Sequence, residues 1–242
     1  MTIQDDNFHV GHRERLKSKF LDNKLMDYEL LELLLSFAIP RRDVRPLARK
    51  LIQHFGGVYY VIAAEYDALI AVPGVGRSTA ILIRLVCEMM KISHIKTLEG
   101  GTIFYNLKAL QEYCRLELAG KTYEEVHILY FDSNFKLIDH ETHSRGSIDS
   151  SNIHIDKILQ KALNKGVRTI VMVHNHPASD NMFSSQDVAI TQALVNLLGS
   201  CGITVFDHYV IVSGILYSMR EKGLLNESFF NKEQFFDFTN RT

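Results

Sequence analysis

The sequence lacks any apolar run close to the roughly 20 residues that a membrane-spanning helix needs. Its first residues, MTIQDDNFHVGHRERLK, also lack the apolar stretch of a secretory signal peptide. From both absences we expect a cytoplasmic protein. Only three cysteines occur, Cys87, Cys114 and Cys201, and none belongs to a CxxC pair. This excludes a disulfide framework and a cysteine zinc site, and it predicts core thiols.

The chain also carries little net charge, −1 over 242 residues. The charges are unevenly divided, because residues 1–97 hold 14 Lys and Arg against 11 Asp and Glu, whereas residues 98–242 hold 13 against 17. The two parts therefore carry about +3 and −4. A mild basic excess permits contact between the first part and nucleic acid but does not require it, since dedicated nucleic-acid modules are more strongly basic.

Residues 11–90 carry apolar side chains at helical spacing and show no strand pattern, which predicts an all-α domain over residues 1–97. Asp27 is expected to cap one helix, which Pro40 ends. Asp43 is expected to open the next, with Pro46 in its first turn and Gly56 at its end. Residues 94–102 show little periodicity and contain a Gly-Gly pair, so we place the domain boundary there.

Within this domain, a predicted helix from residue 67 runs into Pro73-Gly74-Val75-Gly76, and a second helix leaves from Arg77. The pattern resembles the helix-hairpin-helix motif, in which glycines let the backbone approach a phosphate that N–H groups at the start of the second helix can bind. The resemblance implies that Gly74, Gly76 and Arg77 contact a DNA backbone without reading its sequence. A plain αα-hairpin with a glycine turn remains the alternative.

Residues 102–225 mix strands with helices, which predicts an α/β domain with a mixed sheet flanked by helices and makes the chain α+β overall. The predicted strands cover residues 126–131, 135–140, 169–173, 203–206 and 209–212. The predicted helices cover residues 104–118, 154–164 and 185–198. The tail, residues 226–242, contains five phenylalanines, which we expect to dock on the domain or on a partner.

Four polar residues of the segment VMVHNHPASDNMFSSQD have the spacing of a hydrolytic site that holds one metal ion. His174 and His176 end a predicted strand, where residues i and i+2 project to one face and can converge on one cation. Asp187 lies in the first turn of the following helix, where the helix dipole favours a carboxylate. Two imidazoles, one carboxylate and a water in the fourth position describe a catalytic zinc site.

Each part of this segment also has a simpler interpretation. Ser184-x-x-Asp187 is a capping-box variant, and on its own the pattern favours a helix cap. A lone HxH is weak, since histidines at strand ends usually bond to a neighbour or face solvent. The combination is rare by chance: a strand, HxH, a loop of seven residues from Pro177 to Phe183, then Ser184 and Asp187.

That combination resembles the JAMM motif of MPN-domain zinc metalloproteases, and within them the RadC proteins. The resemblance rests on HNHP followed by SxxD, on TQAL, DHYVIV and YSMREKGLL downstream, and on GHRERLKSKF and ELLELLLSFAIPRRD near the start. It covers nearly the whole chain and implies Zn²⁺ held by His174, His176 and Asp187. RadC proteins typically have Ser-Gly after HNHP, where this chain has Ala178-Ser179.

The resemblance also implies a catalytic glutamate upstream, at the start of an adjacent strand. Aligning residues 118–120 and Asp132 with the RadC pattern places it at Glu124, with Glu125 as the alternative, because a shift of one residue reverses a strand's faces. Ser184 would bond the oxyanion or the metal water. His140-x-x-His143 is a weaker candidate for metal ligation. Asp207-His208, between two predicted strands, is expected to lie near the site or to cap the sheet, without an assigned chemical role.

Two functions of different classes follow. The first is a zinc-dependent peptidase or isopeptidase of the RadC type that cuts an amide bond, with its helical domain providing a link to DNA repair or processing. The second is a non-catalytic DNA-binding accessory protein of DNA repair, in which the metal site is structural or vestigial. The complete ligand set, together with a glutamate in register, favours the first. The sequence identifies neither the substrate nor the oligomeric state.

Overall fold

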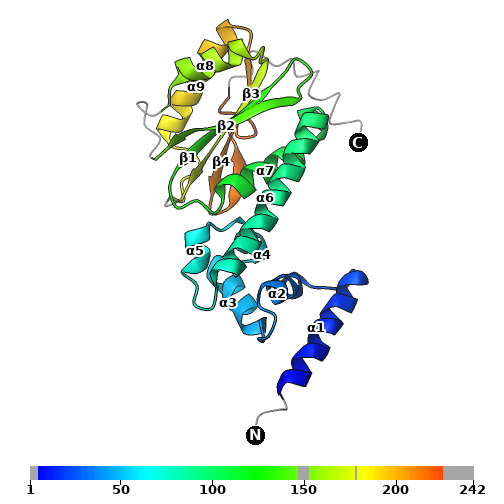
Figure 1. The fold of residues 1–242 in the computed structure, drawn as a ribbon. Coiled ribbons are helices and arrows are strands. Elements are labelled where there is room, and N and C mark those ends of the chain that lie inside the picture. Colours follow the sequence, from blue (N-terminus) through cyan, green and yellow to red (C-terminus); the bar gives the residue numbers. More distant parts are fainter. Residues whose placement is uncertain (1–4, 147–152, 178, 226–242) are drawn as a thin grey trace. The chain divides into compact units, whose positions relative to one another are not determined.

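The computed structural model describes residues 5–146, 153–177 and 179–225 and divides the chain into two compact units (Figure 1). We call them the helical unit, Met1–Met89, and the sheet unit, Met90–Thr242. The phenylalanine-rich tail, residues 226–242, lies outside the described residues. In the parts of the chain that are described, no helix is both long and apolar enough to cross a membrane.

The helical unit consists of helices alone within its described residues, which agrees with the all-α prediction. Its helices are α1 (Asp5–Leu21), α2 (Asp27–Ala38), α3 (Arg45–Phe55), α4 (Val58–Ala63), α5 (Tyr66–Ile70) and the first part of α6 (Arg77–Gly100). Pro46 lies in the first turn of α3, and Gly56 ends the helix with a left-handed φ of 90°.

One predicted cap in this unit is wrong. Asp27 is the first residue of α2 and not its cap, because the chain is already helical there and Met26 holds the cap position. A side chain within the helix forms a hydrogen bond at its N-terminus: the carboxylate of Glu29 accepts the backbone N–H of Met26 at 3.1 Å. Glu29, in the third helical position, thus satisfies the backbone N–H of the cap residue.

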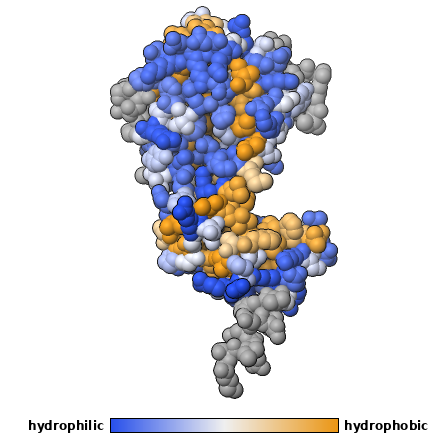
Figure 2. Space-filling view, viewed as in Figure 1, coloured by the Kyte–Doolittle hydropathy of each residue, from blue (hydrophilic) through white to orange (hydrophobic). Residues whose placement is uncertain are grey.

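The helical unit also exposes large apolar side chains. In Figure 2, hydrophobic residues gather at the surface over this unit. A groove of about 480 Å³ lies along α1 and α2, and its lining comprises Lys17, Phe20, Leu21, Leu30, Leu33, Leu34 and Phe37. Phe37 is 66% exposed and Leu21 is 80% exposed.

The sheet unit holds a five-stranded mixed sheet with helices on both faces (Figure 1). The strands are β1 (Glu125–Phe131), β2 (Leu137–Arg145), β3 (Thr169–His176), β4 (Thr204–Val212) and β5 (Ile215–Ser218). Their spatial order is β2-β1-β3-β4-β5; only β3 and β4 run parallel. The other elements are the last part of α6, a 3₁₀ turn η1 (Ile103–Tyr105), α7 (Leu107–Leu118), α8 (Ile155–Asn164) and α9 (Ser185–Ser200).

Two apolar cores lie on the two faces of this sheet. One face packs on α8 and α9, with Ile158 and Leu194 fully buried against Met172 of β3. The other face packs on α7, with Leu110 buried near Val171. Every residue of the central strand β3 is buried, as is typical of a strand covered on both faces. The predicted α/β domain within an α+β chain is therefore confirmed.

Several element boundaries differ from the predictions. Residues 94–100 continue α6, because Leu98 packs into the core beside α7 and this burial stabilises the helix despite the weak periodicity of the segment. The expected helix 104–118 begins as a 3₁₀ turn capped by Thr102. The two predicted strands around Asp207 are one strand, β4, with a register irregularity that absorbs an extra residue before Asp207. Of the three cysteines, Cys87 and Cys114 are buried and Cys201 is partly buried.

Candidate metal centre

The end of β3 places two imidazoles on one side of the sheet. Side chains alternate along a strand, so His174 and His176 both project to the face covered by α8 and α9. In the ladder, His174 lies opposite Val126 of β1 and beside Val210 of β4, which both belong to the core on that face. His174 is completely buried and His176 is 6% exposed. The strand thus holds both rings at the edge of an apolar core.

Helix α9 supplies a carboxylate from its first turn. Ser184 is the N-cap: its Oγ accepts the backbone N–H of Asp187 at 3.0 Å, and Asp187 Oδ2 accepts the backbone N–H of Ser184 at 2.7 Å. The structure therefore contains the capping box that the SxxD pattern alone favours. The box orients the Asp187 carboxylate, which is buried, and leaves both of its oxygens facing β3.

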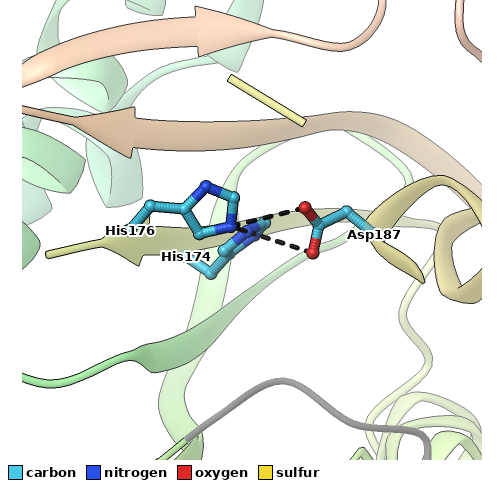
Figure 3. A group of neighbouring side chains, drawn as sticks. All are labelled: His174, His176 and Asp187. Atoms are coloured by element: carbon cyan, nitrogen blue, oxygen red, sulfur yellow. Dashed lines mark hydrogen bonds and ion pairs between the residues drawn. The ribbon is translucent and has the colours of Figure 1, made fainter. Parts of the chain in front are cut away.

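The three side chains converge (Figure 3). The Nε2 atoms of His174 and His176 lie 2.9 Å apart. Asp187 Oδ1 is 3.3 Å from His174 Nε2, and Oδ2 is 3.4 Å from His176 Nε2. Each separation is shorter than twice a zinc–ligand bond of about 2.0–2.2 Å, so one ion can reach all three groups. In the described part of the chain this is the one cluster of three or more His, Cys, Asp or Glu that could hold a metal.

Hydrogen bonds behind the rings direct their lone pairs into the centre. His176 Nδ1 lies 2.8 Å from the backbone oxygen of Asn181. A carbonyl oxygen only accepts, so Nδ1 carries the proton and Nε2 of the neutral ring is left as an acceptor. His174 Nδ1 lies 2.6 Å from His208 Nε2, so its other nitrogen also faces the centre. Two nitrogen lone pairs and a carboxylate pointing at one another form a donor set that fits a cation.

The electrostatics agree with an ionised carboxylate at the centre. Burial alone would raise the pKa of Asp187, but the close imidazoles of His174 and His176 outweigh it and hold the pKa well below its usual range. The same contact with Asp187 raises the pKa of His176. Burial lowers the pKa of His174, which has no solvent contact. The Asp187 carboxylate is thus ionised over the physiological range.

Comparison with known proteins places this geometry in a family. The family model for the RadC-like JAB domain matches residues 104–224. The chain belongs to the RadC family. A curated relative, UPF0758 protein FN0909 of Fusobacterium nucleatum, is 29% identical over 225 residues, which is 89% of this chain and 97% of the relative. The resemblance drawn from HNHP and SxxD is confirmed, and the RadC-like domain includes all three residues of the candidate metal centre.

The two glutamates considered as a catalytic base lie on opposite faces of the RadC-like domain. Val126 is opposite His174 in the antiparallel ladder, so extending that register by two residues brings Glu124 opposite His176, on the metal face. The negative charge of Glu124 also contributes to raising the pKa of His176. Glu125 belongs to the α7 face, where its backbone N–H bonds Asn175 Oδ1 at 2.9 Å.

Glu125 is already engaged in a buried ionic cluster. Its carboxylate contacts His127 Nε2 at 3.1 Å, Arg145 Nε at 2.9 Å and Lys121 Nζ at 3.4 Å. Burial opposes ionisation, but the bond to His127 and the charge of Lys121 outweigh it and lower the pKa of Glu125 to about 2. We name Glu125, His127, Lys121 and Arg145 the ionic cluster of the α7 face.

Two buried residues lie behind His174, and the sequence assigned a chemical role to neither of them. His208 of β4 and Thr191 of α9 form a hydrogen-bonded chain with it, and neither has any appreciable exposure. Asp207-His208 does not lie between strands but inside β4, where Asp207 accepts bonds from Ser218 and from the backbone of Arg220. In the sequence, the polar pair interrupts an apolar run and so indicates the end of one strand and the start of another. Reading residues 204–212 as one alternating strand would have placed His208 on the same face as Val210.

The other sequence candidates lie elsewhere. His140 Nδ1 contacts the hydroxyl of Tyr113 at 3.1 Å, and His143 Nε2 accepts the backbone N–H of His154 at 3.1 Å. Neither joins a metal-type cluster among the described residues. The hairpin residues of the predicted DNA contact belong to the helical unit: Gly74 has a left-handed φ of 105°, and Gly76 and Arg77 are exposed.

Proposed function

We propose that this protein is a zinc-dependent hydrolase of JAMM type that cuts an amide bond in a peptide or isopeptide. The observation that supports this most directly is the convergence of two imidazole lone pairs and an ionised carboxylate at the buried end of β3. Two histidines and one carboxylate, with the fourth position left to water, are a ligand set that catalytic zinc sites use. When bound, the ion acts as a Lewis acid that polarises the scissile carbonyl and lowers the pKa of water.

In this proposal Glu124 is the general base. It is half-buried and lies on the metal face of the sheet, and it forms no part of the three-ligand cluster. It can therefore accept a proton from the attacking water and pass it to the leaving nitrogen without giving up a ligand role. Glu125 is unsuited to this role because the ionic cluster of the α7 face holds its carboxylate on the other side of the sheet.

Ser184 has two compatible roles. As the N-cap it uses its hydroxyl oxygen to accept the Asp187 N–H, and this leaves the hydroxyl proton for donation. The residue is partly exposed and precedes Asp187 by one helical turn, so its donor can meet a substrate oxygen at the centre. We propose that it stabilises the oxyanion that forms as the amide carbonyl is attacked.

The test compares Glu124→Gln with Glu125→Gln, using cleavage of a peptide library and zinc content measured on the same preparations. Glu124→Gln should retain zinc and lose activity on the order of 10²–10⁴-fold, the usual loss for a general base. Glu125→Gln should retain both. His174→Ala should lose both. A zinc-containing wild type that cuts nothing would instead favour the accessory protein with a structural metal site, and an active Glu124→Gln beside an inactive Glu125→Gln would reverse the two glutamates.

A second proposal concerns the helical unit, which we propose contacts the backbone of DNA through the hairpin between α5 and α6. The turn Pro73–Gly76 exposes Gly74 and Gly76, and a Cβ at Gly76 would meet no atom within 4 Å. The backbone N–H groups at the start of α6 are therefore accessible to a phosphate, with Arg77 beside them. Such main-chain contacts position DNA without reading bases.

Binding should be independent of sequence and should weaken steeply between about 50 mM and 200 mM salt. Gly76→Val tests the hairpin better than a change at Gly74, because Gly74 needs its positive φ and its Cβ would lie 3.2 Å from Leu47. Arg77→Ala should also weaken binding of the full chain, whereas Arg15→Ala removes the same charge from α1 and serves as the matched control. If all three variants bind two unrelated duplexes as tightly as wild type, the hairpin has only a structural role.

A further inference from the structure

A chain of three short hydrogen bonds leads away from His174 on the side opposite the metal centre. His174 Nδ1 lies 2.6 Å from His208 Nε2, and His208 Nδ1 lies 2.6 Å from Thr191 Oγ1. Thr191 Oγ1 in turn lies 2.6 Å from the backbone oxygen of Asp187. His208 and His174 are completely buried and Thr191 is 1% exposed. We call His208 and Thr191 the relay.

The end of the relay decides the direction of every bond in it. The Asp187 carbonyl has no hydrogen, so Thr191 must donate to it, and the Thr191 oxygen is then the acceptor for His208 Nδ1–H. A neutral imidazole has one N–H, so His208 Nε2 is left with a lone pair, which accepts His174 Nδ1–H. The remaining nitrogen of His174, Nε2, is therefore the one without a proton. It is the nitrogen that faces His176 and Asp187.

A helix backbone thus specifies which nitrogen of a histidine on a strand carries the proton. The opposite tautomer of His174 would direct an N–H at the two other ligands and exclude a cation. Asp187 participates at both ends, since its carboxylate faces His174 Nε2 while its carbonyl anchors Thr191. The two ends of the relay are consequently joined through one residue.

We propose that His208 and Thr191 are positioning residues, which hold His174 in the Nδ1–H tautomer so that its Nε2 can bind the metal. This inference rests on the proposed metal centre. Partners behind a ligating histidine are known to orient the ring and raise its basicity, and their loss typically weakens metal binding about 10–100-fold. His176 has a simpler arrangement, in which the backbone oxygen of Asn181 takes the same part directly.

The variants follow from the bond directions. Thr191→Val keeps the shape and removes the acceptor for His208, whereas Thr191→Ser keeps the hydroxyl. His208→Leu removes the acceptor for His174, whereas His208→Gln retains an acceptor near the position of Nε2 and a donor toward Thr191. The Val and Leu variants should bind zinc about 10–100-fold more weakly than wild type, and the Ser and Gln variants should recover most of the affinity.

Two measurements test the proposal on the full chain: zinc affinity by competition with a chelator, and nitrogen NMR of the imidazoles in the zinc-free protein. Wild-type His174 should carry its proton on Nδ1, and Thr191→Val should shift it toward Nε2, a change that lost packing alone would not produce. A proton on Nε2 in wild type, or unchanged zinc affinity in Thr191→Val, overturns the relay. A wild type that binds no zinc overturns the metal centre itself, and with it this role.

Discussion

A buried carboxylate lies beside histidines on each face of the sheet, near the end of β3. On one face Asp187 approaches His174 and His176. On the other, Glu125 approaches His127 but also Lys121 and Arg145. In both places burial raises the pKa of the carboxyl group, but the neighbouring polar groups lower that pKa by a larger amount. Both carboxyl groups are therefore ionised. The two sites differ in what balances the negative charge.

The difference separates a structural cluster from a candidate metal site. Glu125 has permanent cations within contact distance, so the ionic cluster of the α7 face balances its negative charge. Among the residues that the structure describes, no Lys or Arg pairs with Asp187, whose partners are imidazoles and a backbone N–H. A buried charge needs a countercharge or a dense set of hydrogen bonds. Lysine and arginine supply that charge on the α7 face. On the other face, the proposed metal ion would supply it.

The largest expected effect is loss of the metal itself. His176→Ala and Asp187→Asn each remove one of three protein ligands, so zinc content should fall from one per chain to nearly none after gel filtration. His127→Ala changes a buried histidine of the ionic cluster and should leave one zinc per chain. Elemental analysis decides between these outcomes, and equal zinc in all of these variants would place the metal elsewhere.

Zinc should next stabilise the fold, and only through one face. At free zinc about 1,000 times its dissociation constant, a ligand that binds only the folded state adds about 4 kcal/mol to the free energy of unfolding. We expect this gain in wild type and in Glu125→Gln, but not in Asp187→Asn. Urea unfolding of the full chain with and without zinc, read at the transition of the sheet unit, measures this gain in unfolding free energy. A similar gain in Asp187→Asn would mean that zinc acts at another site.

A smaller and pH-dependent effect is expected on the α7 face. Glu125→Gln should lower the free energy of unfolding by about 1–3 kcal/mol at neutral pH, because it removes hydrogen bonds between charged groups. The pKa of Glu125 is lowered in the folded state to about 2, from the 4.5 that is usual for a glutamate in water. Its contribution is therefore complete above about pH 5 and declines as the pH falls toward 2.

The measurement is the difference in unfolding free energy between wild type and Glu125→Gln across that range, in zinc-free protein. The difference should shrink with acid. A difference that stays constant from pH 5 to pH 2 would show that Glu125 stabilises the fold by packing alone.

The smallest effect concerns the helix cap that joins the two roles of Ser184. Ser184→Ala removes the acceptor for the Asp187 N–H, and the loss of such a cap costs about 1 kcal/mol of unfolding free energy. The loss should appear in zinc-free protein, where no metal holds Asp187. Ser184→Thr retains the hydroxyl and is the control. If Ser184→Ala unfolds like wild type, the cap contributes nothing measurable.

Local patterns predicted much of this molecule because their causes are local. The i, i+2 spacing of His174 and His176 places them on one face of any strand, and Ser184-x-x-Asp187 orients the carboxylate through a capping box. The Gly56 helix end follows from the backbone conformation that glycine permits. The helix at residues 94–100 was not predictable in the same way, because the packing of Leu98 stabilises it and not its own periodicity.

The sequence by itself determined the fold class, the strand and helix that carry the three candidate ligands, and the membership in the RadC family that HNHP and SxxD indicate. Only the tertiary structure decided the register between β1 and β3, which places Glu125 on the α7 face and, when continued past the start of β1, brings Glu124 to the face of His176. It alone brought His208 and Thr191 behind His174. These residues are 17 to 34 positions from their partners, and a hydrogen bond between them exists only once α9 and β4 pack against β3.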